Sequence, residues 1–359
     1  MAGDSTYDLA LTHCADGVTA ILSDKLVLDW NDIPYIDFDQ PYWNGAMNDM
    51  LNNAGNLPFV GSSYLILDPN CVMYNIEMYK NYGFDNLYGI IDDGQWTWDK
   101  LTELAASASK DLDGNGEFDE NDQYGFESAR SWIYGSVPTS CDQYIMERDD
   151  DGVPQLAVNT EKMAGIIEKM IKLSYSDNAS FMTPTLTNDN STQIRFDTGR
   201  ILFYLYPIRD IMEVYRQSEV DYGIVPFPKY DEAQEKYISL NWSGLMCVPI
   251  TVEDTELVGA AIEYLSYYTH KDFMPVFYES LLSEKLARDE DSIRMLNIIY
   301  DNCVYDFGLN FSTGANKLFY TVEHMLKAKN TNLASFYAAN ETHVKAHYDN
   351  VYKMFEEME

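Results

Sequence analysis

Residues 111–122, with the sequence DLDGNGEFDEND, carry oxygen-bearing side chains at the spacing of a calcium-binding loop. Calcium is bound by several hard oxygen ligands on a compact loop, and a glycine at the sixth position allows the sharp turn that such a loop needs. Gly116 stands at that position. The spacing therefore predicts a site for one Ca²⁺ ion. The predicted ligands are Asp111, Asp113, Asn115, the backbone carbonyl of Glu117, Asp119 and Asp122.

The loop fits a structural role better than a regulatory one. A calcium sensor normally pairs two such loops and exposes a groove when calcium binds, and the sequence contains no second copy. The last position is Asp122 rather than the usual Glu, whose longer side chain reaches the ion with both oxygens. We therefore expect a structural Ca²⁺ clip. An acidic turn that needs no ion is the alternative.

The elements on either side of this loop are well marked. Before it, Thr97 can cap a helix in which Leu101, Leu104 and Ala105 recur at helical spacing. After it, we expect a strand in QYGFES, at 123–128. Trp96 and Trp98 are assigned to packing and to the start of the helix.

The rest of the chain alternates strands and helices, and helices accumulate towards its end. This order predicts an α/β fold, and a length of 359 residues suits two lobes. No flexible linker divides the lobes, so we expect the chain to cross between them through strands. Further strands are expected at 7–13, 64–67, 72–74, 199–207 and 242–251, and further helices at 159–176, 254–269, 271–285, 289–302, 315–329 and 341–357.

The composition excludes some classes of partner. The formal net charge of −34 argues against binding nucleic acid, whose phosphates require a basic surface, and against direct binding to an anionic membrane. The 28 Tyr, 16 Phe and 6 Trp are compatible with a sugar-binding cleft as well as with ordinary packing. The 5 Cys form no CxxC pair, and we expect them to be small buried side chains.

The first residues, MAGDSTYDLALTH, do not read as a signal peptide, because they lack a basic region followed by an apolar one. No run of about 20 apolar residues predicts a membrane span. Either the protein is cytoplasmic or an export signal has been removed from it.

Several segments together resemble family 1 extracellular solute-binding proteins of bacterial sugar ABC transporters, the maltose-binding-protein-like type. Each segment alone is a weak signal, but their order along most of the chain is quite specific to the family. The segments are VMYNIEMYKNYGF, GQWTWDKLTELAASASKDLDGNGEFDENDQYGF, FDTGRILFYLYP, DYGIVPFPKYDEAQEKY and WSGLMCVPIT.

The resemblance implies two α/β lobes of the periplasmic-binding-protein type (type II), joined by crossing segments that act as a hinge around an interlobe cleft. It places residues 1–107 and about 240–302 in the N-terminal lobe, and about 108–239 and 303–359 in the C-terminal lobe. Family members usually have a lipoprotein signal and further elements before the strand that here begins near residue 6. We therefore expect the initial part of the first lobe to be absent.

The resemblance also supplies candidate ligand contacts, because sugar sites combine aromatic faces with polar groups. Matching the motifs gives Thr12, His13, Asp68, Trp132, Tyr206, Arg209 and Trp242. Three of these have an ordinary structural alternative. Asp68 begins the turn-forming sequence DPN, Arg209 could form a surface salt bridge, and His13 could have only local partners.

The function that the resemblance implies is capture of a mono- or oligosaccharide for an ABC importer, without catalysis. The expected partners are the carbohydrate and the transporter's permease subunits, and we expect a monomer. The expected location is the outer face of the cytoplasmic membrane, with a lipid anchor in the full-length form. A glycan-active enzyme and a calcium-regulated interaction protein are the alternatives, although 58 acidic residues make chance carboxylate pairs uninformative.

Overall fold

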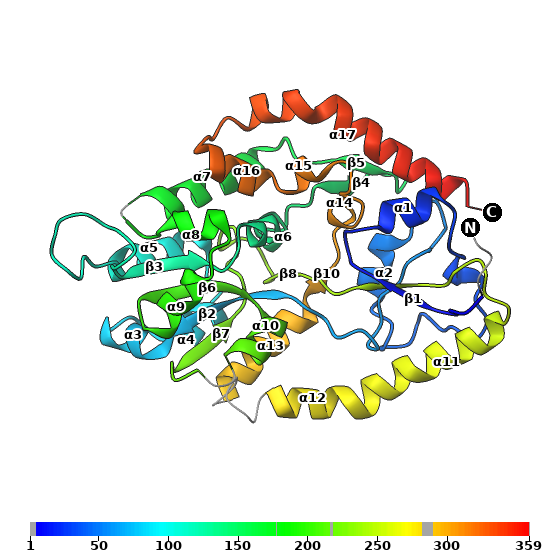
Figure 1. The fold of residues 1–359 in the computed structure, drawn as a ribbon, viewed down its shortest axis with the longest axis horizontal. Coiled ribbons are helices and arrows are strands. Elements are labelled where there is room, and N and C mark those ends of the chain that lie inside the picture. Colours follow the sequence, from blue (N-terminus) through cyan, green and yellow to red (C-terminus); the bar gives the residue numbers. More distant parts are fainter. Residues whose placement is uncertain (1–4, 177, 216–217, 282–289, 359) are drawn as a thin grey trace.

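The computed structural model describes residues 5–176, 178–215, 218–281 and 290–358. Two groups of helices and strands lie side by side and are joined by segments that cross between them (Figure 1). We call the group around β1 (Ala10–Thr12) the first lobe and the group around β6 (Ile201–Pro207) the second lobe. The predicted α/β class with two lobes is confirmed.

The first lobe is built on a small antiparallel sheet of β1 and β9 (Leu245–Cys247), in which Thr12 lies opposite Leu245. The residue before β9 must be glycine here, because a Cβ on Gly244 would lie 2.7 Å from the backbone oxygen of Thr12. The helices of this lobe are α1 (Val18–Ser23), η1 (Trp30–Asp32), α2 (Gly45–Leu51), α11 (Thr255–Tyr268), the π-helical η3 (Thr269–Phe273) and α12 (Met274–Leu281).

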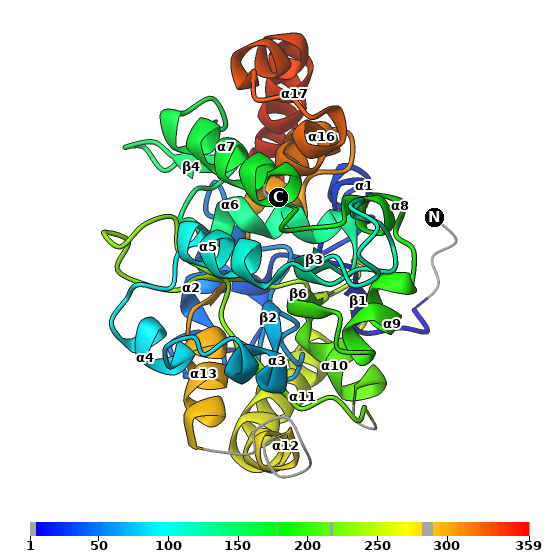
Figure 2. The ribbon, with the colours of Figure 1, turned by 90° about the vertical axis from the view of Figure 1, so that its left-hand side faces the viewer.

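The second lobe contains a four-stranded sheet in the order β3-β6-β2-β7. β6 runs parallel to β3 (Tyr124–Ser128) and antiparallel to β2 (Asn70–Asn75), which also pairs with β7 (Tyr222–Val225). Every residue of β6, ILFYLYP, is buried, as expected for a central strand covered on both faces. Figure 2 shows α7 and α16 on one side of this sheet and α3, α4, α10 and α13 on the other.

The helix predicted before the acidic loop and the helix predicted at 159–176 are both present. Thr97 Oγ1 accepts a hydrogen bond from the backbone N–H of Lys100 at the start of α5 (Trp98–Ala108), and Thr160 caps α7 (Glu161–Tyr175) in the same way. The remaining helices are α3 (Ile76–Asn81), α4 (Leu87–Asp92), η2 (Ser131–Gly135), α6 (Ser136–Ser140), α8 (Met182–Thr187), α9 (Ser191–Asp197), α10 (Ile208–Val214), α13 (Glu290–Asp301), α14 (Phe307–Asn310), α15 (Asn316–Phe319), α16 (Thr321–Ala328) and α17 (Leu333–Glu356).

Three chain segments meet where the lobes join. β8 (Ser239–Leu240) pairs in parallel with β10 (Cys303–Val304), and Pro69 forms an antiparallel bridge with Asn241. Figure 1 places β8 and β10 between the two lobes. The chain therefore crosses near residues 69, 240 and 303, through extended segments rather than flexible linkers.

The predicted boundary at residue 107 is wrong. Strand β2, at 70–75, lies between β6 and β7 in the sheet of the second lobe, so the first crossing comes before it. Helix α13 also packs on the second lobe, where Ser292 Oγ and Tyr88 Oη are 3.2 Å apart, although the prediction placed residues 240–302 in the first lobe. The pairing partners of a strand, which decide its lobe, are not visible in its own residues.

The strand predicted at 64–67 is also wrong. Residues 63 and 64 form a turn, and the backbone N–H of Leu65 donates to the carbonyl of Ser62. Tyr64 N–H donates to Ser62 Oγ, so local side-chain hydrogen bonding competes with strand formation despite the apolar sequence YLIL.

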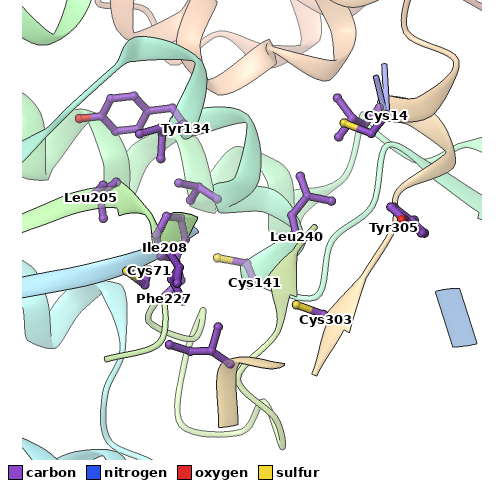
Figure 3. Packing of buried hydrophobic residues seen from close by; sticks show 14 of the residues in the cluster. Cys14, Cys71, Tyr134, Cys141, Leu205, Ile208, Phe227, Leu240, Cys303 and Tyr305 are labelled. Carbon is purple, nitrogen blue, oxygen red and sulfur yellow. The ribbon is translucent and has the colours of Figure 1, made fainter. Parts of the chain in front are cut away.

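All five cysteines are free and buried, as predicted. Figure 3 shows Cys14, Cys71, Cys141 and Cys303 among apolar side chains near the junction of the lobes. Burial raises the pKa of the Cys14 thiol to about 12, so these thiols stay protonated at neutral pH. Trp96 and Trp98 are likewise fully buried, which confirms their assignment to packing.

A hairpin of the second lobe also contacts the first lobe. Between β4 (Met146–Arg148) and β5 (Pro154–Leu156) the chain turns tightly, and the Arg148 guanidinium donates to the backbone oxygens of Asp49 (3.1 Å) and Asn52 (2.6 Å). These carbonyls lie at the C-terminal end of α2, where the last turn of a helix leaves acceptors without intrahelical partners. Arg148 therefore links the lobes at a second place.

Candidate functional site

Four aromatic side chains meet near the crossing segments. The ring centroids of Trp132 and Trp242 are 4.7 Å apart at 63°, and Trp242 meets Phe319 at 6.0 Å and 76°. Phe319 in turn packs edge-on against Tyr320 at 4.8 Å. Phe319 is buried, whereas the other three rings are partly exposed. We call these four residues the aromatic cluster.

Helix η2 of the second lobe and a crossing segment hold the aromatic cluster in place. Trp132 lies in η2, which packs so closely on residues 319–320 that a Cβ on Gly135 would lie 2.7 Å from the ring of Phe319. Trp242 lies between β8 and β9, and its backbone N–H donates to the backbone oxygen of Asp68 at 3.1 Å. Partly exposed rings fixed in this way can stack on the C–H face of a sugar.

Asp68 and Arg209 form an ion pair next to Trp242. The carboxylate of Asp68 lies 3.3 Å from Arg209 Nη1 and also accepts the backbone N–H of Arg209 at 3.3 Å. Burial raises the pKa of Asp68, and the Arg209 guanidinium offsets part of that effect. The Asp68 N–H donates to Asn241 Oδ1, which fixes the turn against the crossing segment. A carboxylate with a half-exposed guanidinium offers both acceptors and donors to ligand hydroxyls.

The sequence prediction thus selected residues that the structure brings together. Trp132, Trp242, Asp68 and Arg209 form a continuous chain of ring, backbone and ionic contacts. The ordinary alternative for Asp68 was a turn residue, and that for Arg209 was a salt bridge. The ion pair between the two side chains fulfils both alternatives. The Arg209 side chain is 59% exposed and the Asp68 side chain only 6%, so the guanidinium is the more accessible of the two to a ligand.

Tyr206 lies at the end of β6, close to Arg209 in sequence, but it is largely packed. Its ring contacts those of Tyr204 and Tyr215 at 5.3 and 5.2 Å. Burial raises the pKa of Tyr206 to about 12, and the negative charge of Asp210 acts in the same direction. It can reach a ligand only through the small part of its surface that stays exposed.

Thr12 ends β1 in the first lobe, His13 follows it, and both make local contacts. Nδ1 of His13 accepts the backbone N–H groups of Ala15 and Asp16 at 3.1 and 3.3 Å, and Thr12 Oγ1 donates to the Asp16 carbonyl. This satisfied histidine matches the ordinary alternative for His13. Burial is the main cause that raises the pKa of Tyr320, and the carboxylates of Glu323 and Asp16 act in the same direction. Within the described part of the chain, this turn makes no hydrogen bond to the aromatic cluster.

Sequence reasoning missed several residues of this region. Phe319 and Tyr320 lie in helical sequence with no motif, and only the folding of η2 onto residues 319–320 reveals them. Ser136 accepts a hydrogen bond from the indole of Trp242 at 2.9 Å. Asn241, immediately before Trp242, offered a signal, because a polar amide in an otherwise apolar crossing strand needs a specific partner.

The acidic loop folds as a compact ring of side chains. Carboxylate oxygens of Asp111, Asp113 and Asp122 lie within 4.8 Å of one another. Asp111 accepts the backbone N–H groups of Gly114 and Gly116, and these hydrogen bonds, led by that from Gly116, lower its pKa. Three converging anionic oxygens at this separation fit a hard cation such as Ca²⁺.

A pocket of ≈ 340 Å³ lies between the first lobe and the end of α13, and no residue of the aromatic cluster lines it. It includes none of the predicted ligand contacts. Its lining includes Pro41, Asn44, Ser63, His270, Met274 and Asp301.

Comparisons of structure find many similar proteins. UspC of M. tuberculosis superposes with a TM-score of 0.67 and 15% identity over 96% of this chain and 87% of that one. A sugar transporter of Rhizobium etli in an open conformation gives 0.66 and 14%, over 100% and 87%. The cyclic α-maltosyl-1,6-maltose binding protein of Arthrobacter globiformis gives 0.64 and 15%, over 96% and 85%. No family model and no curated protein matches the sequence.

These matches establish the fold. They cover nearly the whole chain, and the chain has the two-lobed architecture of solute-binding proteins that the sequence motifs predicted. Among the described helices, none is both long and apolar enough to cross a membrane.

Proposed function

We propose that this protein is an extracytoplasmic solute-binding protein that captures a carbohydrate between its two lobes and delivers it to an ABC importer. The ligand would lie on the aromatic cluster, with hydroxyls bound by Asp68 and Arg209. Closure of the lobes would trap it, and the binding energy would shift the equilibrium between open and closed forms. The mechanism requires no chemical step.

The observation that carries the proposal is the position of the aromatic cluster. Trp132 belongs to the second lobe, Trp242 lies in a crossing segment, and Asp68 begins another, so one ligand on these groups would touch the second lobe and two of the segments that join the lobes. The similarity to proteins named for a sugar ligand, including the Arthrobacter globiformis protein, supports a carbohydrate as the ligand.

The partners follow from this role. The protein would dock on the permease subunits of the importer at the outer face of the cytoplasmic membrane, and we propose that it acts there as a monomer held by a lipid anchor.

We also propose that the loop at 111–122 binds one Ca²⁺ ion as a structural clip, with ligands from Asp111, Asp113, Asn115, Glu117, Asp119 and Asp122. It joins α5 to β3 at the outer end of the second lobe, far from β8 and β10 (Figure 1).

Isothermal titration with maltose, maltotriose, a cyclic maltosyl-maltose and tagatose tests the proposal. We expect saturable binding of one sugar class without turnover. Trp242→Ala should weaken that binding about tenfold, since loss of an aromatic contact removes roughly 1.5 kcal/mol. Tyr264→Ala, at an exposed ring on α11, is the matched control and should leave affinity unchanged. Hydrolysis of a sugar, or binding unaffected by the Trp242 change, would contradict the proposal.

A further inference from the structure

Ser136 joins three separate parts of the chain through one oxygen atom. Its Oγ accepts the indole Nε1–H of Trp242 at 2.9 Å and the side-chain amide N–H of Asn70 at 2.8 Å. Ser136 is the first residue of α6, Asn70 begins β2, and Trp242 leads into β9. Ser136 is buried, with 1% of its surface exposed.

The chemistry of this contact is specific to a hydroxyl. A serine oxygen has two lone pairs, and here two donors occupy both. Alanine would leave the buried Asn70 amide and the Trp242 indole N–H without this acceptor, and a buried donor that loses its acceptor costs free energy. The indole N–H can only donate, so the Trp242 ring must turn its N–H edge towards the Ser136 oxygen. The hydrogen bond to Ser136 therefore sets which edge of the ring faces the second lobe.

From this geometry we propose that Ser136 is a positioning residue for ligand binding, which acts by fixing the Trp242 ring against Trp132. The inference rests on the proposed function, since Trp242 is assigned there as the stacking face. By holding Asn70 as well, Ser136 ties two crossing segments to α6, so the ring keeps its orientation while the lobes move.

A purely structural role for Ser136 makes a different prediction. Two indoles whose centroids are 4.7 Å apart couple their electronic transitions, and this produces paired bands of opposite sign in the far-ultraviolet circular dichroism spectrum. A structural role would lower the melting temperature and leave the paired bands in place. A positioning role makes the paired bands depend on Ser136.

Ser140 provides a matched control in the same short helix. Its Oγ lies 3.4 Å from the indole nitrogen of another tryptophan, Trp98, and it is as buried as Ser136. Ser140→Ala therefore removes the same atoms from an equivalent environment without touching the aromatic cluster. We expect it to reduce stability and to retain both the paired bands and the sugar affinity.

The experiment compares Ser136→Ala, Trp242→Phe and the double variant, with circular dichroism and sugar titration for each. We expect Ser136→Ala to lose most of the intensity of the paired bands. Trp132→Phe removes one of the two indoles and therefore gives the reference spectrum without paired bands. Sugar affinity should fall roughly tenfold. In the Trp242→Phe background, which has no indole N–H, Ser136→Ala should cause no further loss of affinity, because the two changes remove the same interaction.

Three results would overturn the proposal. The first is retention of the paired bands in Ser136→Ala, and the second is an unchanged sugar affinity in that variant. The third is that Ser136→Ala lowers sugar affinity in the Trp242→Phe background as much as it does in the unmodified protein. If Ser136→Ala does not fold, Ser136→Cys keeps nearly the same shape with a weaker acceptor and should show intermediate band intensity. If no sugar binds the unmodified protein, the proposed function fails, whereas the spectra still decide whether Ser136 orients Trp242.

Discussion

The pair of Glu127 and Arg195 offers a test of the energetics of the second lobe. Glu127, on β3, is 0% exposed, and its two oxygens accept bonds from Arg195 Nε at 2.9 Å and Nη2 at 2.5 Å. Burial raises the pKa of Glu127, and the guanidinium offsets part of that increase. Such a pair compensates the loss of hydration only while both partners are present.

Arg195→Met should therefore lower the free energy of unfolding by about 3–5 kcal/mol at pH 8, because it leaves an uncompensated buried carboxylate. The loss should be smaller at pH 5. Without Arg195 the pKa of Glu127 in the folded state rises further above its value in the unfolded state. The folded variant therefore keeps a proton that the unfolded chain releases, and the stability of the variant falls as pH rises. Replacing both partners, in Glu127→Leu with Arg195→Met, should restore most of the stability.

Urea unfolding followed by circular dichroism at pH 5 and pH 8 measures these differences. Arg294→Met is the control, because Arg294 pairs with Asp92 and Asp291 at a half-exposed site where an ion pair contributes only about 0–1 kcal/mol. An Arg195→Met loss below about 1 kcal/mol, or one that is larger at pH 5 than at pH 8, would refute the reasoning.

Three further predictions concern the loop, the hairpin and a buried carboxyl. Calcium at 100 times its dissociation constant should stabilise the protein by about 2.7 kcal/mol, which raises the melting temperature. Asp122→Asn should abolish this rise, and Asp150→Asn, at an exposed position, should keep it. An equal rise in both variants would exclude the loop as the calcium site. Arg148→Ala should increase the radius of gyration in small-angle X-ray scattering, because the hairpin no longer holds α2, and an unchanged radius would show that this contact does not restrain the lobes. Burial raises the pKa of Asp306 to about 6, so its protonated form stabilises the fold at low pH. In urea titrations the stability of Asp306→Asn relative to the unmodified protein should rise by about 2 kcal/mol between pH 4 and pH 7, and a flat difference would contradict this assignment.

Local sequence patterns predicted much of the fold. The run ILFYLYP indicated a central strand, and Thr97 was correctly predicted as the cap of the helix that begins at Trp98. These features depend on residues that are close in the chain, where periodicity and capping act directly. The apolar run at 64–67 failed because Ser62 provides hydrogen bonds to the following backbone, a competition that apolar periodicity does not report.

The sequence by itself determined the α/β class, the candidate calcium loop and the identity of four residues that meet near the crossing segments. Only the tertiary structure decided that β2 belongs to the second lobe, that Phe319 and Tyr320 complete the aromatic cluster, and that Ser136 holds Trp242. The reason is physical. Capping and periodicity act over a few residues, whereas sheet partners and ring contacts join segments tens to hundreds of positions apart, and their choice depends on how the whole chain buries its apolar surface.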